Sequence, residues 1–222
     1  MELLTNLSVI YIDHFGDDLS PVKAARVSTL SDTRTHDPAR DLKLAKYLLE
    51  HGHTSPYEHA GATFRISAPL YVARQIMRHR TCSYNEVSRR YTDEEISFYL
   101  PRTLHSQHAL RLQCSADTLI EKSAETLEMM RAHYEASEAL YTELLARGVA
   151  REEARQVLPV SLMTQFYMTA NLLNWLKFIA IRTDPHTQND TRTIATALKL
   201  QLSTLFPQTM QIAEEVMFTP TK

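Results

Sequence analysis

Residues 74–91 read RQIMRHRTCSYNEVSRRY, and the rest of the chain is organised around this stretch. It contains five arginines and a single acidic residue, Glu86, so its local charge is +4 in a protein whose net charge is −2. Guanidinium groups bind phosphate oxygens in a bidentate way, and the hydroxyl and amide side chains between the arginines supply neutral donors. The stretch therefore predicts a pocket for a small polyanion.

An arginine-rich segment is more often a solvated face or a surface that pairs with acidic residues. Two features argue against that interpretation. The segment begins as an apolar helix containing Leu70, Ala73, Ile76 and Met77, so it is at least partly packed. Its arginines also have almost no acidic neighbours within the segment, so their partner lies elsewhere in the fold or is a ligand.

Length and composition limit the classes of protein to which this chain can belong. A chain of 222 residues buries roughly 70% of its unfolded surface, and we expect one domain over residues 1–222. The pI near 6.6 argues against a general nucleic-acid binder. No run is long enough to span a membrane, and Met1-Glu2-Leu3-Leu4 lacks a signal-peptide pattern. Cys82 and Cys114 form no disulfide or metal framework, so we expect a cytoplasmic protein without nucleic-acid or membrane partners.

The first half of the chain alternates predicted strands and helices. Runs of β-branched or alternating apolar residues predict strands at 7–13, 62–68 and 96–100. Ser20-Pro21 and Asp37-Pro38 are helix-start signals, with Ser20 and Asp37 as N-caps. The second of these helices runs from 38 to 51 and carries its apolar face on Leu42, Ala45, Leu48 and Leu49.

The second half is predicted to be helical. Residues 115–147 contain no Gly or Pro and predict one long helix, or two with a bend, about 50 Å in length. A helix that long overhangs a small domain and indicates subunit packing. A short helix follows at 151–157, then a buried helix at 161–181 with Arg182 at its end. Asn189-Asp190 caps a helix to about 206, and Pro207 precedes a last one. The pattern predicts an α+β fold, with a small antiparallel or mixed sheet and long helices.

Residues 51–59, HGHTSPYEH, form a polar loop with three histidines. Metal binding is one interpretation, and a loop of solvated or capping histidines is the other. No cysteine accompanies them, and spacing alone does not establish the ligand number and geometry that zinc needs. Both interpretations remain open at this stage, and we predict no metal site.

The order of residues in three blocks resembles the flavin-dependent thymidylate synthase family. The first block is Arg78-His79-Arg80, Ser83, Asn85-Glu86, Ser88 and Arg90-Tyr91. The second, His53-x-Ser55-Pro56-x-Glu58-His59, resembles the family's His-x-Ser-Pro-x-Glu-His motif. The third is Arg155-x-x-Leu158-Pro159 followed by Thr164, Asn171, Arg182 and Gln188. The three blocks occur in the family's order and cover roughly residues 20–190.

The resemblance implies roles for individual residues and a homotetramer whose FAD sites are shared between subunits. The residues implied to bind FAD are His53, Ser55, Glu58, Arg78, His79, Arg80, Asn85, Glu86, Asn171 and Lys177. The residues implied to bind dUMP are Gln75, Arg78, Glu86, Val87, Ser88, Arg89, Arg90, Arg155 and Arg182. The residues implied to act in catalysis are Arg182, Ser88 and His53.

The same resemblance implies the reaction. It is the reductive C5 methylation of dUMP to dTMP, with methylenetetrahydrofolate as carbon donor and NADPH as reductant through FAD. Leu173 and Lys177 depart from the family's common residues, which leaves open a sister enzyme that methylates UMP or another uridylate. A non-catalytic nucleotide- or RNA-binding module is the alternative from a different class.

The two cysteines bear on the mechanism, because thymidylate synthases of the other type attack C6 of the pyrimidine with a thiolate. Neither cysteine here lies in an obvious nucleophile context. Arg80 stands two residues before Cys82, and a neighbouring cation lowers a thiol pKa. The family's motif requires no cysteine at this position, so we expect Cys82 to be dispensable. The resemblance instead places Arg182 near the pyrimidine carbonyl, where it would stabilise developing negative charge.

Overall fold

A four-stranded antiparallel sheet forms the centre of the protein. The computed structural model describes residues 1–30 and 37–218. Its main sheet has the order β2 (Ser8–Phe15), β3 (Gly61–Pro69), β8 (Met163–Asn171) and β4 (Ser83–Glu86). Strands β3 and β8 pair along their full length, from Gly61 opposite Asn171 to Pro69 opposite Met163. The central pair therefore joins the first third of the chain to its last third.

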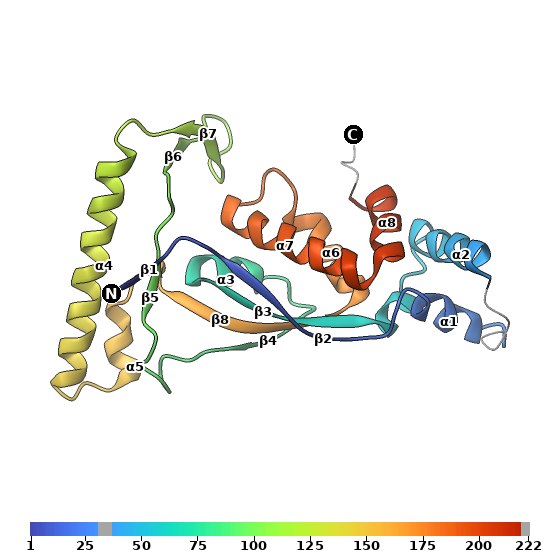
Figure 1. Ribbon diagram of the computed structural model, residues 1–222, viewed down its shortest axis with the longest axis horizontal. Helices are drawn as coiled ribbons and strands as arrows, with labels where there is room; N and C mark the ends of the chain where they lie inside the picture. Colours follow the sequence, from blue (N-terminus) through green and yellow to red (C-terminus); the bar gives the residue numbers. More distant parts are fainter. Residues whose placement is uncertain (31–36, 219–222) are drawn as a thin grey trace.

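One face of the sheet carries the core. Phe64 and Ile66 of β3 and Phe166 and Met168 of β8 are almost completely buried, whereas Tyr167 between them is 44% exposed. Burying side chains of this size contributes about 1.5–3 kcal/mol each. The buried face is covered by the helices α3 (Leu70–Ile76), α6 (Leu172–Arg182), α7 (Asn189–Leu205) and α8 (Pro207–Val216) (Figure 1). The alternation in burial matches the two-residue period of a strand with one packed face.

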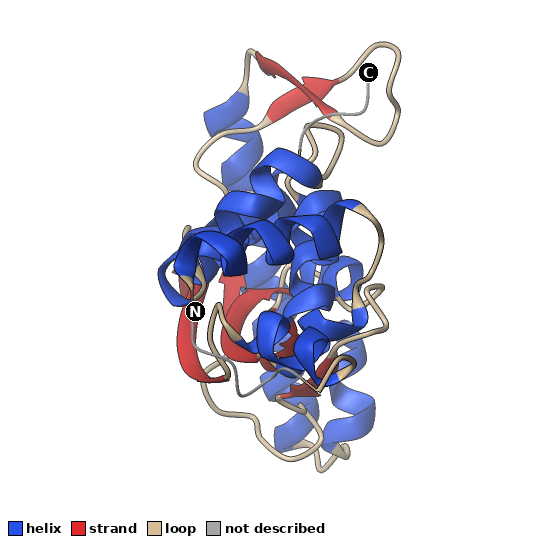
Figure 2. Cartoon of the chain, turned by 90° about the vertical axis from the view of Figure 1, so that its right-hand side faces the viewer, coloured by secondary structure: helices blue, strands red, loops and turns tan. Residues whose placement is uncertain are grey.

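The remaining elements lie at the two ends of the sheet (Figure 1). At one end are α1 (Ser20–Val27), α2 (Pro38–Glu50) and the 3-10 helix η1 (Ser55–His59). There the Tyr57 hydroxyl donates to the carbonyl of Ala45 at 2.8 Å and ties η1 to α2. At the other end are the parallel pair β1 (Glu2–Leu4) and β5 (Ser97–Tyr99), with α4 (Ser123–Ala146), α5 (Arg151–Ala154) and η2 (Arg155–Val157). The hairpin of β6 (His105–Gln107) and β7 (Ser115–Leu119) projects beyond the helices (Figure 2).

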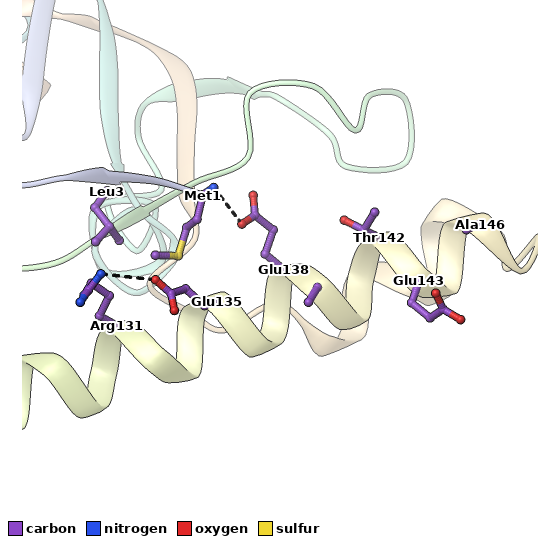
Figure 3. A pocket seen from close by; sticks show the side chains of 9 residues that line it. Met1, Leu3, Arg131, Glu135, Glu138, Thr142, Glu143 and Ala146 are labelled. Carbon is purple, nitrogen blue, oxygen red and sulfur yellow. Dashed lines mark hydrogen bonds and ion pairs between the residues drawn. The ribbon is translucent and has the colours of Figure 1, made fainter.

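The N-terminus packs against α4. The Met1 ammonium group lies 3.3 Å from the Glu138 carboxylate, and Arg131 pairs with Glu135 one turn along the helix (Figure 3). These residues line a hollow of about 780 Å³ between α4 and the first strand. The hollow contains none of the residues that the sequence analysis assigns to FAD, dUMP or catalysis. Gln75 lies instead on α3, and Lys177 and Arg182 lie on α6.

The predicted helix at 161–181 is wrong in its first half. Residues Met163–Asn171 form strand β8, and only Leu172–Arg182 are helical. A continuous apolar run is compatible with either a buried strand or a buried helix, and its periodicity does not separate the two. The pairing of β8 with both β3 and β4 decides for the strand. Asn171 is consequently the N-cap of α6 rather than a residue inside a helix.

The predicted helix at 115–147 is also too long. Residues Ser115–Leu119 pair with β6 in the hairpin, and α4 begins only at Ser123. The Gln107 side-chain amide donates to the Cys114 carbonyl at 2.9 Å and helps to hold the hairpin loop. At 24 residues, α4 is about 36 Å long rather than about 50 Å. A segment without Gly and Pro can form a helix, but residues 115–119 form a strand because they pair with β6.

Most other predicted elements are confirmed, with changes at their ends. Strands 7–13, 62–68 and 96–100 correspond to β2, β3 and β5, and 151–157 corresponds to α5 with η2. Asp37 caps α2 by accepting from the amides of Ala39 and Arg40. Ser20 is not an N-cap, because it is the first residue of α1 and its hydroxyl donates to Asp17 at 3.1 Å.

Two further details of the helices differ from the prediction. Leu42 was assigned to the buried face of α2 but is 40% exposed, so the packed stripe of that helix is narrower. The cap position of α7 is Gln188, one residue before the predicted Asn189-Asp190, and no side chain there closes the helix end. Among residues 1–30 and 37–218, no helix combines the length and the apolar character needed to cross a membrane.

Candidate active site

Helix α6 connects the predicted site residues. The side-chain oxygen of Asn171 accepts from the amide of Asn174 at 2.9 Å, which ends strand β8 and starts α6. The backbone amide of Leu172, the first residue of α6, donates to the carbonyl of Ala60 at 2.7 Å. Ala60 directly follows η1, so the loop bearing His53, Ser55 and Glu58 is fixed beside the first turn of α6. These three side chains are exposed residues flanking the buried Tyr57.

Further along α6, the helix packs against the turn at residues 77–82. The side-chain amide of Asn174 donates to the carbonyl of Thr81 at 3.3 Å, and Phe178 meets the His79 ring edge-on at 5.4 Å. The Tyr84 hydroxyl donates to the carbonyl of His79 at 2.8 Å. Arg78 and Arg80, on either side of His79, are exposed. The turn is thus held through its backbone and His79, while its two guanidinium groups stay available to a ligand.

Arg182 lies at the C-terminal end of α6 and reaches α3. Its Nη2 donates to the carbonyl of Gln75 at 3.0 Å, and its Nε is buried with no hydrogen-bond partner among the described residues. Burial lowers the pKa of Arg182 from its usual value, but a guanidinium remains charged at neutral pH. A half-buried cation with one unused N–H is suited to an anion or a carbonyl oxygen brought by a ligand.

His79 is the most perturbed histidine of the site. Burial lowers its pKa, and the nearby positive charges of Arg182 and Lys177 lower it further, against one hydrogen bond to the Asn174 backbone that raises it. His79 is therefore neutral near pH 7. Its Nε2 is buried and has no partner within the described residues. The imidazole offers a neutral donor or acceptor to whatever binds beside α6.

Strand β4 and the loop that follows it carry the remaining arginines. The Glu86 carboxylate accepts from the Thr164 hydroxyl at 2.7 Å, and the amide of Val87 donates to the carbonyl of Gln165 at 2.9 Å. After these anchors the chain leaves the sheet. The Arg90 guanidinium lies 5.3 Å from the centre of the Tyr91 ring, and both side chains are exposed.

Arg89 has a different environment from Arg90. Its guanidinium donates to the carbonyls of Glu94 and Glu95, and burial lowers its pKa. Arg89 therefore closes the loop 88–95 through these two bonds, while its Nε is buried without a partner among the described residues. The predicted nucleotide contacts of this loop then fall mainly to Ser88 and Arg90.

The residues assigned to dUMP do not converge in one chain. Gln75 opens into a groove of about 830 Å³ lined also by Tyr71, Tyr99 and Asp190. Val87 and Arg89 open into a different groove, of about 670 Å³, beside β1 and β8. Arg155 lines neither groove and donates to the carbonyl of Glu152 at 3.3 Å on η2. In one copy of the chain, Gln75 therefore lines a different groove from Val87 and Arg89.

The histidine loop gives no metal centre in the described part of the chain, where no three His, Cys, Asp or Glu side chains are arranged to hold an ion. His51 stacks on Tyr47 at 4.1 Å between ring centres, and its Nδ1 lies 2.9 Å from the Tyr47 carbonyl. His53 also stacks on Tyr47, at 6.2 Å. The loop therefore presents a small aromatic surface next to Ser55 and Glu58.

Cys82 does not have the lowered pKa that its proximity to Arg80 predicted. Burial raises the pKa of its thiol to about 11, so it is protonated at neutral pH. The prediction failed because Arg80 is exposed while the thiol points into partly buried surroundings, and burial penalises the thiolate. A protonated, partly buried thiol is a poor nucleophile, which agrees with the expectation that Cys82 is dispensable.

The two departures from the family pattern have different environments. Leu173 is 4% exposed and belongs to the main core cluster, so it faces the packing rather than the site. Lys177 is exposed and close enough to His79 to depress its pKa. Of the two, only Lys177 can act on a ligand bound along this face of α6.

Sequence reasoning missed several polar residues that hold the site. Asp190 accepts from the hydroxyls of Tyr71 and Tyr99, and Thr191 donates to Gln75. These partners are distant in sequence, and no local pattern marks them. Asn174, which belongs to none of the three sequence blocks, donates to the Thr81 carbonyl.

Comparison with known proteins places the chain among enzymes. The model of the family described as "Thymidylate synthase complementing protein" matches residues 11–208. Flavin-dependent thymidylate synthases of Thermosipho africanus and Pseudothermotoga lettingae are 43% and 39% identical over 80% and 95% of this chain, and 77% and 91% of their own lengths.

Two solved structures are also similar. They are of the UMP/dUMP methylase PolB from Streptomyces cacaoi, bound with 5-Br dUMP and 5-Br UMP. Both are 31% identical to this chain, with TM-scores of 0.91 and 0.84. The alignments cover 100% of both chains in the first case and 98% of both chains in the second.

A pH titration tests the environment of His79. A histidine whose pKa is lowered on folding binds a proton more readily in the unfolded state, so the folded state loses stability as pH falls below about 6.5. We expect the thermal midpoint of the wild-type protein to fall more between pH 7 and pH 5.5 than that of His79→Gln, which has no group to protonate. Equal losses in the two proteins would contradict a lowered pKa at His79.

Proposed function

Because the chain belongs to the flavin-dependent thymidylate synthase family, we propose that it methylates C5 of dUMP reductively to give dTMP. FAD is the cofactor, methylenetetrahydrofolate the carbon donor and NADPH the reductant. The observation that supports this most directly is the face of α6, which joins the histidine loop, the Arg78–Arg80 turn and Arg182. All three are blocks of the family pattern.

The residues along this face fit a flavin dinucleotide. Arg78 and Arg80 are exposed cations suited to its diphosphate, and Lys177 adds a third positive charge. His79 Nε2 and Arg182 Nε are buried polar atoms that lack protein partners in the described chain, so a polar ring bound there would satisfy them. His53, Ser55, Glu58 and Asn171 would hold the other side of the same molecule, with Asn85 and Glu86 from β4. When bound, FAD supplies hydride transfer from the nicotinamide to the new methyl group.

The protein's own residues supply orientation and charge. C5 of uracil is a weak nucleophile, and its attack on a methylene group places negative charge on the pyrimidine carbonyls. Arg182, fixed by its bond to the Gln75 carbonyl, is a preorganised cation that would stabilise that charge. Ser88 and Arg90 would bind the phosphate, and the free energy of that binding would hold the pyrimidine in the orientation that the reaction requires. No thiolate is needed, and the raised pKa of Cys82 agrees with this.

The balance of the reaction is consistent with these co-substrates. The methylene carbon passes from the folate to C5, and the C5 proton leaves. Two electrons and a proton, carried as hydride from NADPH, reduce the methylene to a methyl group. Folate is then released as tetrahydrofolate rather than dihydrofolate.

We infer that the working enzyme is a homotetramer in which the active site combines residues of different subunits. Gln75 lines one groove and Val87 and Arg89 line another, which supports a site completed by a second copy of the chain. Arg155 is exposed on η2 and lines neither groove, so in this proposal it would reach the nucleotide of a neighbouring copy.

UMP is a second candidate substrate. The two PolB structures bind bromo analogues of both dUMP and UMP, and this chain matches them over almost its whole length. Lys177, which differs from the usual family residue, lies on the ligand-facing side of α6. Both dUMP and UMP are therefore candidate substrates, although the relatives with higher sequence identity are named thymidylate synthases.

Tritium release from C5-labelled nucleotides tests the function. With FAD, NADPH and methylenetetrahydrofolate, we expect tritium release from dUMP that disappears when either FAD or the folate is omitted. Labelled UMP is run beside it under the same conditions. Tritium release from UMP alone would show that the enzyme methylates UMP and not dUMP. A yellow, flavin-loaded protein that releases tritium from neither would overturn the proposed chemistry while leaving the family intact.

Substitution of Arg182 tests its role. Arg182→Ala is expected to keep FAD bound and to lower turnover on the order of 100- to 1000-fold, as removal of an oxyanion-stabilising group does. Cys82→Ala is the matched control from the same region and is expected to stay active. Unchanged turnover in Arg182→Ala would remove Arg182 from the mechanism, and an inactive but folded Cys82→Ala would restore a thiolate mechanism.

A further inference from the structure

We propose that Thr191 is a positioning residue that sets the orientation of the Gln75 side-chain amide, and so fixes Gln75 as a hydrogen-bond donor to the nucleotide. This inference rests on the proposed function, because it names the chemistry of one contact within that site. It concerns a residue outside the three sequence blocks. Thr191 lies in the first turn of α7, and Gln75 lies in the last turn of α3.

Two hydrogen bonds between side chains join α3 to α7. The Tyr71 hydroxyl donates to Asp190 at 2.7 Å, and the Thr191 hydroxyl donates to the side-chain oxygen of Gln75. Tyr71 and Gln75 are four residues apart and share one face of α3. Tyr99 of β5 donates to the other oxygen of Asp190 at 3.0 Å. The start of α7 is thereby locked against the α3 face that lines the groove.

The direction of the Thr191 bond follows from its surroundings. Thr191 is 0% exposed, so its hydroxyl proton needs an acceptor inside the protein. Other threonines of α7 donate to the carbonyl four residues earlier in their own helix, as Thr193 does at 3.0 Å and Thr196 at 2.9 Å. Thr191 instead donates to Gln75 Oε1. One lone pair of the Gln75 amide oxygen is therefore engaged by Thr191, which directs the Nε2, with its two N–H donors, away from Thr191.

The junction of α3, α6 and α7 consequently offers donors to a ligand. Gln75 contributes its Nε2, and Arg182, bonded to the Gln75 carbonyl, contributes a guanidinium that has no acceptor capacity. Gln75 lines the groove of about 830 Å³. The group that meets Gln75 must then be an acceptor oxygen, from either the phosphate or a pyrimidine carbonyl. Without Thr191 the amide would be free to turn and present its oxygen instead.

The test compares two variants of Thr191 in the FAD-loaded enzyme. Thr191→Val keeps the shape and removes the hydroxyl, whereas Thr191→Ser keeps the hydroxyl. We expect Thr191→Val to weaken dUMP binding about tenfold, the effect of one lost hydrogen bond to the ligand, and Thr191→Ser to stay within about twofold of wild type. FAD retention should be equal in all three proteins. Equal dUMP affinity for the Val and Ser variants would overturn the inference.

A double-substitution cycle separates positioning from a general packing effect. In a Gln75→Ala background, Thr191→Val should cause no further loss of dUMP affinity, because the amide that Thr191 orients is gone. An additional tenfold loss would show that Thr191 acts through something else. Deoxyuridine, which lacks the phosphate, distinguishes the two acceptors. If the Thr191→Val penalty vanishes with deoxyuridine, Gln75 meets the phosphate, and if the penalty persists, Gln75 meets the pyrimidine.

Gln75→Glu provides an independent arm in case Thr191→Val does not fold. The carboxylate can still accept from Thr191, but it presents an oxygen to the ligand where Gln75 presents Nε2. We expect an unchanged thermal midpoint and more than tenfold weaker dUMP binding. Wild-type affinity in Gln75→Glu would contradict the donor role. A wild-type enzyme that binds no dUMP would instead refute the proposed function, and the inference would fall with it.

Discussion

The hydrogen bond between the Asn171 side chain and the amide of Asn174 is the constraint on which the site depends. It fixes where the central strand β8 stops and where α6 begins. Because β8 is held on both sides, by β3 and by β4, the direction of α6 is set by the sheet. The histidine loop, the Arg78–Arg80 turn and Arg182 then take their positions from successive turns of one helix. A small shift in the start of α6 would therefore displace all three of these groups.

Two arginines of the predicted site have backbone carbonyls as their hydrogen-bond partners in the described part of the chain. Arg89 and Arg182 donate to backbone carbonyls, those of Glu94 and Glu95 in one case and of Gln75 in the other. Carbonyl oxygens satisfy guanidinium donors but do not cancel the charge. The field therefore remains positive where a nucleotide and a dinucleotide cofactor would bring their phosphates. The pKa of His79 is lowered first by burial and further by the charges of Arg182 and Lys177, so its ring is neutral.

The site residues remain predictions from the family pattern, whereas the elements that carry them can be compared with the structure. Asn171 and Arg182 were identified from the family pattern, and β3 and α2 from their periodicity. Residues 163–171 were taken for helix because the apolar run has no local feature that distinguishes a buried strand from a buried helix. The hairpin at 105–119 was missed because its pairing involves residues about ten positions apart. The Asp190 and Thr191 contacts were not predictable, since they depend on how α7 packs against α3.

The central claim is that one chain holds only part of the active site. Its most direct test is complementation between two inactive variants, Gln75→Ala and Arg90→Ala, co-expressed with different affinity tags so that mixed oligomers can be isolated. If the site combines Gln75 of one subunit with Arg90 of another, some sites in the mixed oligomers carry neither substitution. Tritium release from labelled dUMP should then rise far above that of either parent. Mixed oligomers no more active than the average of the two parents would contradict a shared site and place Gln75 and Arg90 around the same nucleotide within one subunit.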